Sequence, residues 1–244
     1  MSYTDFAYIY DELINEDYTN WANYIETIFL RYGNGINLVL DLACGTGSIT
    51  TLLAKKGYDM IGIDKSPDML AVAAQKKGSL PICYTCQDMT DFELYGTVDA
   101  IICTLDSINY ITDTEQLKKT FALVKNYLNP KGLFIFDINS KHKIAKVLGN
   151  NTFIFDQGNI FYTWENVYHQ KTKICTYKLT FFIKNGAKYY RKDELQRQRA
   201  YSQNQITRML DQANLTVLGC FDGLTFNPPS QTSGRLMFVC KNIC

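Results

Sequence analysis

Two glycines and a carboxylate in the first fifth of the chain have the spacing of a ligand-binding turn. Residues 37–50 read NLVLDLACGTGSIT: an apolar run that contains Asp41, then Gly45 and Gly47 one residue apart. A strand that ends in a glycine-rich turn and leads into a helix presents backbone N–H groups and the positive end of the helix to a ligand. Glycine is needed there because a Cβ atom would hold the ligand away from the backbone. The turn therefore predicts a site for an anionic or strongly polar ligand.

The same turn departs from the pattern that binds dinucleotides. That pattern asks for a third small residue three positions after the second glycine, where this chain has Thr50. Asp41 would also repel a pyrophosphate, whereas it would suit a cationic amine. The next apolar run ends in Asp64, about where an acidic residue accepts hydrogen bonds from ribose hydroxyls. Together these residues predict a ligand with a ribose, an amino group and no phosphate.

At these residues the chain resembles the class I S-adenosylmethionine-dependent methyltransferases. DLACGTG, starting at Asp41, is similar to the first motif of that family, and GIDKSPDML, which contains Asp64, is similar to the second. At CQDM, Asp88 matches the family's acidic residue for the adenine amino group. The resemblance covers residues 37–140 and, more weakly, both ends. The N-terminal stretches YIYDEL and DYTNW are similar to the small-molecule branch near glycine N-methyltransferase and to bacterial proteins of unassigned substrate.

The resemblance implies S-adenosyl-L-methionine as the methyl donor and a set of donor-binding residues from several segments. They are Tyr10, Trp21, Asp41, Ala43, Gly45, Gly47, Asp64, Lys65, Met69, Asp88, Met89, Thr104 and Leu105. Tyr10 and Trp21 could instead be helix packing, Met69 a core residue and Asp88 a solvated loop acid. Agreement of four separate segments in order and spacing favours the donor site.

The catalytic residues are harder to predict because the positive sulfur of such a donor already activates the methyl group. The protein then mainly positions the reactants, which can contribute roughly 7–11 kcal/mol. A general base is optional, and Tyr110 and His142 are the candidates. His142 follows an apolar run at the end where ligands of open α/β sheets bind. Because it stands between Lys141 and Lys143, it equally fits a solvated loop.

Acceptor-binding residues are expected after the fourth and fifth apolar runs and in the aromatic region that follows. They are Asp106, Asn109, Asn139, Tyr162, Trp164, Tyr177 and Arg191. Residues 184–199 hold six basic and two acidic side chains, which could line the pocket of an acidic acceptor or contact a polyanion. A solvated hairpin is the favoured reading. A small-molecule acceptor is expected, and nucleic acid stays open as a partner.

The elements that must position these residues alternate between strand and helix over residues 37–139. Apolar runs at 37–43, 59–64, 81–86, 98–104 and 132–138 are separated by helix-like segments, as in a parallel sheet with crossover helices. Runs at 216–222 and 236–241 complete an α/β fold with a doubly wound, mostly parallel seven-stranded sheet.

Capping residues predict where three helices begin. Ser66 followed by Pro67 is a typical helix start. Thr112 with a glutamate three residues later predicts a capping box, as does Ser202 with Gln205.

From residue 150 the pattern changes to alternating aromatic and β-branched residues. Asn185 and Gly186 separate two such runs and predict a hairpin in which both occupy turn positions with positive φ. We therefore expect an antiparallel sheet inserted after the fifth strand. Residues 1–149 and 201–244 would form the donor-binding core with an N-terminal helical cap, and residues 150–200 would cap the acceptor site.

Composition bounds the class of protein. A net charge of +1, from 25 basic and 24 acidic residues, gives no overall attraction to nucleic acid or anionic membranes. No apolar run approaches the ~20 residues that span a bilayer, and the amino terminus lacks the basic start of a secretory signal. Cys44, Cys83, Cys103 and Cys240 lie in or beside apolar runs and are expected to be reduced core thiols. A cytoplasmic globular protein without a metal site is expected.

Two other functions fit part of the pattern. An NAD-dependent oxidoreductase would share the sheet topology, although Thr50 and Asp41 argue against it. A sensor or scaffold that binds the methyl donor without catalysis would keep the same motifs and need no base.

Overall fold

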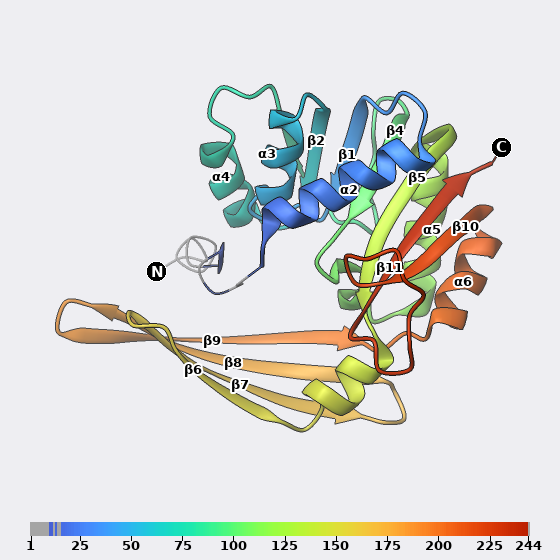
Figure 1. The fold of residues 1–244 in the computed structure, drawn as a ribbon. Coiled ribbons are helices and arrows are strands. Elements are labelled where there is room, and N and C mark those ends of the chain that lie inside the picture. The colour runs from blue at the N-terminus through green and yellow to red at the C-terminus, as the bar shows by residue number, and fades with distance from the viewer. Residues whose placement is uncertain (1–9, 12, 14–15, 244) are drawn as a thin grey trace.

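The computed structural model describes residues 10, 11, 13 and 16–243, and its centre is a seven-stranded sheet (Figure 1). The strand order is β10-β11-β5-β4-β1-β2-β3. Strands β1 to β5 pair with one another in parallel, and β11 lies antiparallel between β5 and β10. The bounds are β1 Leu38–Leu42, β2 Asp59–Asp64, β3 Cys83–Cys86, β4 Val98–Cys103, β5 Leu128–Asn139, β10 Leu215–Asp222 and β11 Arg235–Asn242. The predicted doubly wound, mostly parallel sheet is confirmed.

Helices cover both faces of this sheet because its strands are apolar on both sides. Successive strand residues point to opposite faces, and in β1 both Val39 and Leu40 are fully buried. Val39 packs in the core formed with helices α2 (Tyr18–Tyr32) and α3 (Ser48–Lys55). Leu40 packs in the core formed with α5 (Thr114–Tyr127) and α6 (Gln203–Gln212). Helix α4 (Pro67–Lys76) lies against β2 and β3.

Two of the three predicted helix starts are confirmed. The Ser66 side chain caps α4, and Ser202 and Gln205 form the reciprocal capping box of α6. The prediction for α5 is wrong by one position. Asp113, not Thr112, is the N-cap, and its carboxylate accepts hydrogen bonds from two N–H groups of the first turn. Aspartate is at least as good an N-cap as threonine, so the two adjacent candidates could not be separated by residue type.

A four-stranded antiparallel sheet follows β5, as predicted, and extends below the core as a long, narrow sheet (Figure 1). Its strands are β6 Thr152–Asp156, β7 Ile160–His169, β8 Ile174–Asn185 and β9 Lys188–Arg199, in that order. The short helix η2 (Lys143–Leu148) leads into it. The side of this inserted sheet that buries Tyr162, Tyr177 and Phe181 packs toward the core.

The β8–β9 hairpin is present, but its turn differs from the prediction. Asn185 pairs with Lys188, so Gly186 and Ala187 form the two-residue loop. Gly186 has φ +62°, whereas Asn185 ends the strand. A two-residue turn with glycine at the first central position needs positive φ only there, which removes the need for asparagine.

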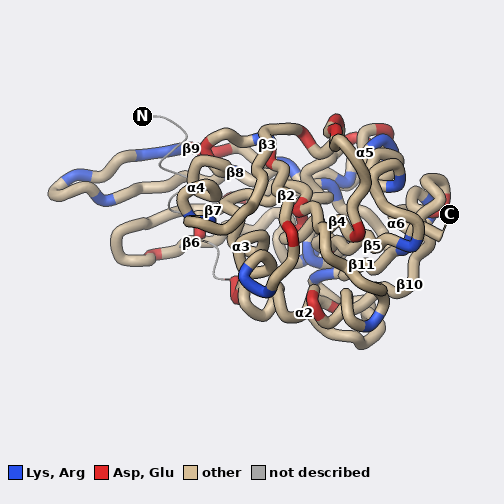
Figure 2. Tube along the Cα trace, turned by 90° about the horizontal axis from the view of Figure 1, so that it is seen from above, with Lys and Arg blue, Asp and Glu red and all other residues tan. Residues whose placement is uncertain are grey.

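The molecular surface mixes charges of both signs, and basic residues gather toward the free end of the β8–β9 hairpin (Figure 2). Cys103 and Cys240 are buried as expected, but Cys83 is exposed on the edge strand β3. In the part of the chain that the structure describes, all seven cysteines are free thiols. None of the described helices is long and apolar enough to cross a bilayer.

Candidate active site

Three adjoining cavities lie at the carboxyl ends of the core strands, and two of them reach the inserted sheet. The wide cavity, of about 600 Å³, separates the loops after β1 and β2 from β9. The inner cavity, of about 300 Å³, lies against the inserted sheet. The narrow cavity, of about 40 Å³, lies beside Asp41. Tyr10 lines all three. Ligands of open α/β sheets bind at this end of the strands.

The wide cavity brings together most of the predicted donor-binding residues. Its core side is lined by Ala43, Gly45, Asp64, Lys65, Met69 and Met89. Gly45 has φ +55° and open space where a Cβ atom would project, so its backbone is accessible to a ligand. Asp64 accepts hydrogen bonds from the N–H groups of Gly45 (2.9 Å) and Ser66 (2.8 Å). Burial raises its pKa, and these bonds oppose the shift.

The narrow cavity contains a buried carboxylate that is only half satisfied. Asp41 is 2% exposed, and its Oδ2 accepts a hydrogen bond of 2.5 Å from the hydroxyl of Thr50. Its Oδ1 has no hydrogen-bond partner among the described residues. Burial raises the pKa of Asp41 to about 7 because the charged form is poorly solvated. Thr104 and Leu105 line the same cavity. The threonine that breaks the dinucleotide pattern thus orients Asp41.

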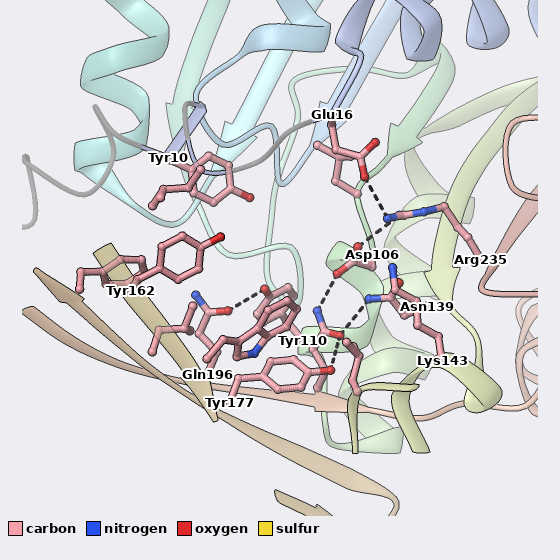
Figure 3. A pocket seen from close by; sticks show the side chains of 17 residues that line it. Tyr10, Glu16, Asp106, Tyr110, Asn139, Lys143, Tyr162, Tyr177, Gln196 and Arg235 are labelled. Carbon is pink, nitrogen blue, oxygen red and sulfur yellow. Dashed lines mark hydrogen bonds and ion pairs between the residues drawn. The ribbon is translucent and has the colours of Figure 1, made fainter. Parts of the chain in front are cut away.

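One end of the inner cavity holds a cluster of charges around Arg235 (Figure 3). Its Nη1 pairs with Asp137 and, at 3.2 Å, with Asp106, and its Nη2 lies 3.5 Å from Glu16. Burial opposes the charge of Arg235, but the three carboxylates outweigh burial and raise its pKa. Burial raises the pKa of Asp137, and the positive charge of Arg235 opposes this shift. Lys143 also lines the cavity, and burial followed by repulsion from Arg235 lowers its pKa.

The inserted sheet supplies the aromatic wall of the inner cavity. Tyr162, Trp164 and Tyr177, predicted as acceptor residues, line it together with Leu179 and Phe181. The rings of Trp164 and Tyr177 meet edge to face with centroids 5.5 Å apart, a favoured aromatic geometry. The cavity therefore combines an apolar aromatic wall with a charged end.

Residues from both sheets meet between the wide and inner cavities. Tyr110 donates its hydroxyl proton to Gln196 Oε1 at 2.9 Å, and both side chains line both cavities. Gln198 Nε2 donates to Asp106 Oδ2 at 2.6 Å. Leu105 and Asp106 both have positive φ, 57° and 53°. Residues other than glycine are strained in this backbone conformation, and such residues cluster at functional sites. Here the two residues follow the end of β4 and lie at the cavities.

Some of the predicted donor-binding residues do not line the three cavities. Trp21 is 1% exposed in α2, where its indole donates to Glu16 Oε2 at 3.0 Å and its ring lies under Arg235, 5.3 Å from the guanidinium carbon. Asp88 accepts hydrogen bonds from the N–H and hydroxyl of Thr90, at 2.9 and 2.8 Å. Neither side chain lines the three cavities. Trp21 therefore supports Glu16 and Arg235 from below, and Asp88 closes its own turn.

Gly47 caps the start of α3, where a Cβ atom would collide with the Tyr84 hydroxyl. It does not line the three cavities, so its role in donor binding stays a prediction. His142 precedes η2 and is likewise outside their linings, whereas its neighbour Lys143 lies within. Arg191 pairs with Asp193 at 2.9 Å on the exposed part of β9.

Two predicted acceptor residues, Asn139 and Asn109, lie next to each other but make different contacts. Asn139 lines the inner cavity, and its Nδ2 donates to Gln198 Oε1 at 3.2 Å. Asn109 is fully buried behind it and bonds the backbone of Asn139 and Arg199. Asn109 thus joins the end of β5 to the end of β9.

Sequence reasoning missed five polar or charged residues that line the inner cavity: Glu16, Lys143, Gln196, Gln198 and Arg235. For two of these residues, Gln196 and Gln198, the sequence did contain a usable pattern. Gln196 and Gln198 stand at alternate positions of a strand, so they share one face, but only the tertiary structure shows that this face is the inner one. Of the N-terminal cap predicted from YIYDEL, residues 8, 9 and 12 lie outside the described residues.

Comparisons with known proteins agree with this geometry. Residues 39–132 match the methyltransferase domain family. A Geobacillus sp. (strain WCH70) protein named as a methyltransferase is 34% identical over 99% of this chain and 100% of its own length. The crystal structure of an S-adenosylmethionine-dependent methyltransferase from Clostridium acetobutylicum ATCC 824 is 36% identical, covers 98% of both chains and has a TM-score of 0.91.

A partial relative is the glycine/sarcosine N-methyltransferase of Halorhodospira halochloris, which is 34% identical over 42% of this chain and 40% of its own length. None of these comparisons supports an oxidoreductase. Full-length similarity to methyltransferases, the sheet order and the glycine turn with its two aspartates all agree. The chain therefore belongs to the class I S-adenosylmethionine-dependent methyltransferases.

Proposed function

We propose that this enzyme transfers the methyl group of S-adenosyl-L-methionine to the nitrogen of a small amine held in the inner cavity. The observation that carries the proposal is the charge around that cavity. Glu16 and Asp106 line the cavity together with the cations Lys143 and Arg235, and a third carboxylate, of Asp137, pairs with Arg235 behind the lining, which leaves this cluster one carboxylate in excess. An excess of carboxylates at a partly buried site favours a cationic ligand.

Two buried features fit the donor. Asp41 Oδ1 has no partner among the described residues and suits the cationic amino group of the donor's amino acid end. Asp64, at the end of β2, suits the ribose hydroxyls, and the open backbone at Gly45 admits a close ligand. The bound donor supplies a methyl group on a positively charged sulfur, so the protein residues chiefly position and shield the reactants.

The acceptor would lie where the narrow and inner cavities share Tyr10 and Leu105. Asp106 lines the inner cavity and is suited to hold an amine, because Arg235 and Gln198 fix its two carboxylate oxygens and each oxygen can accept a further hydrogen bond. Aromatic faces such as those of Tyr162 and Trp164 attract cations. A volume of about 300 Å³ is at the lower end for small-molecule sites, which supports a modest-sized acceptor.

The inserted sheet, residues 150–200, would act as the cap that excludes water from this acceptor site. It supplies the aromatic wall of the inner cavity, and β9 reaches the wide cavity. Similarity to an N-methyltransferase of glycine and sarcosine supports a nitrogen acceptor. Methylation of an oxygen is the competing outcome, because O-methyltransferases also match part of the chain.

The test is turnover of the methyl donor with a panel of small amines and the alcohols and acids of matching shape. We expect S-adenosylhomocysteine and an N-methylated product, identified by mass spectrometry, with the amines. Asp106→Asn should lower kcat/KM for the best amine about tenfold or more, because a charge-assisted hydrogen bond contributes about 1.5–3 kcal/mol.

A matched control is Asp193→Asn, which changes an exposed aspartate on β9 that pairs with Arg191. It should leave kcat/KM unchanged, and neither variant should alter the affinity for S-adenosylhomocysteine. Turnover of alcohols or acids with none of the amines would contradict the proposal.

A further inference from the structure

Strand β9 presents a row of polar side chains toward the core. Glu194, Gln196 and Gln198 occupy alternate positions and are partly or fully buried, whereas the intervening Leu195 and Arg197 are exposed. Because strand residues alternate between faces, the three polar side chains share the inner face. Gln198 and Gln196 bond Asp106 and Tyr110, as described above. Glu194 is the residue of this row whose carboxylate is not fully hydrogen-bonded.

The carboxylate of Glu194 is hydrogen-bonded at one oxygen and lacks a hydrogen-bond partner among the described residues at the other. Its Oε1 accepts a hydrogen bond of 2.8 Å from Gln196 Nε2. Its Oε2 is buried and has no hydrogen-bond partner among the described residues. Leaving a buried polar atom without a partner costs free energy, and a charged one costs more. Since Glu194 lines the wide cavity, a ligand in that cavity can supply the missing donor.

The opposite wall of the wide cavity identifies the ligand. Gly45, Asp64, Met69 and Met89 line it there. All four belong to the predicted donor-binding residues, and Asp64 is the residue proposed above for the ribose hydroxyls. We propose that Glu194 binds this nucleoside, accepting at Oε2 a hydrogen bond from a ribose hydroxyl or from the adenine amino group. This inference rests on the donor placement proposed above.

The arrangement makes the inserted sheet part of the donor site as well as the acceptor cap. On the core side, the predicted donor residue Asp88 does not line the wide cavity, whereas Glu194 lines it from the facing wall. Gln196 fixes the orientation of Glu194 and is itself bonded by Tyr110. Glu194 therefore stands in a preformed position, which limits the ordering cost of binding.

The direct test is the affinity of Glu194→Gln for S-adenosylhomocysteine, measured by isothermal titration calorimetry without any acceptor. We expect binding at least about tenfold weaker than in the natural protein, as for loss of one charge-assisted hydrogen bond. The control is Glu165→Gln on β7, whose carboxylate is exposed and 3.8 Å from Lys178. It should bind as the natural protein does. Equal affinity in Glu194→Gln and the control would overturn the proposal.

Donor analogues identify the bonded group. Analogues of S-adenosylhomocysteine that lack the 2′-hydroxyl, the 3′-hydroxyl or the adenine amino group are titrated into the natural protein and Glu194→Gln. The analogue without the bonded group should lose affinity in the natural protein and much less in the variant, because the two changes remove the same interaction. Full additivity for all three analogues would overturn the proposal.

A structure of the natural protein with S-adenosylhomocysteine makes the test independent of folding of the variant. A Glu194 oxygen within about 3.2 Å of a nucleoside nitrogen or oxygen is expected, and a longer separation would overturn the inference. These binding measurements need no acceptor. Failure of the amine panel would therefore leave them intact, and failure here would leave amine methylation intact.

Discussion

Asp41 has an ordinary carboxyl pKa of 3.8, which the fold raises to about 7. Because the folded state holds this proton more tightly than the unfolded chain, the contribution to stability is fully present below about pH 4 and is lost as pH rises toward 7. Above that range the unliganded protein keeps a buried negative charge in which Oδ1 has no partner among the described residues. A cationic group on the donor would compensate that charge.

The pH dependence of donor affinity follows from this shift. Between about pH 5.5 and about pH 7, affinity for S-adenosylhomocysteine should rise, by up to about tenfold per pH unit, because the donor's cation binds the ionised carboxylate. Asp41→Asn should flatten this profile and weaken binding at neutral pH. Calorimetry at several pH values measures both effects. A steep profile that persists in the variant would assign the titration to another group.

At the scale of elements, Asn109 holds the two sheets together. Its Oδ1 accepts the N–H of Asn139 (2.8 Å), and its Nδ2 donates to the carbonyl oxygens of Asn139 (3.2 Å) and Arg199 (2.9 Å). Asn109→Ala leaves these buried backbone groups without partners and should lower the free energy of unfolding by about 2–4 kcal/mol. Urea unfolding followed by circular dichroism measures the change.

Asn166 on β7 offers a matched comparison. It is 4% exposed, and neither polar atom of its side chain has a partner among the described residues. Asn166→Leu should leave the free energy of unfolding unchanged or raise it, because it removes an unsatisfied buried amide at similar volume. If Asn109→Ala and Asn166→Leu lowered the free energy of unfolding equally, loss of any buried asparagine would explain the change. The role of Asn109 in connecting the two sheets would then be wrong.

At the scale of the whole molecule, the wide cavity is walled by both sheets, so donor binding should stabilise them together. At about 100 times its dissociation constant, S-adenosylhomocysteine should raise the free energy of unfolding by about 2.7 kcal/mol. NADH should give no shift, because Asp41 disfavours a pyrophosphate and Thr50 stands where the dinucleotide pattern has a small residue. Thermal unfolding with each ligand measures the difference, and stabilisation by NADH alone would contradict the donor assignment.

The overall fold could be predicted because its signals are local. Each core strand is a short apolar run, and β2 was predicted with its observed bounds, Asp59–Asp64. The errors at Thr112 and Asn185 are one-residue shifts, where a neighbouring residue satisfies the same cap or turn. Propensity does not separate such neighbours, because their free energies differ by a few tenths of a kcal/mol or by about 1 kcal/mol at most.

By itself, the sequence determined the class of ligand. Asp41, Gly45 and Asp64 lie within two adjacent strand ends, and their chemistry can be read from local spacing because parallel neighbours place their carboxyl ends together. The proposed acceptor site and the proposed second wall of the donor site could be found only from the tertiary structure. Glu16, Asp106 and Arg235 are far apart in the chain, and the face that β9 turns inward depends on how the inserted sheet packs. Those contacts depend on long-range packing, which no local pattern encodes.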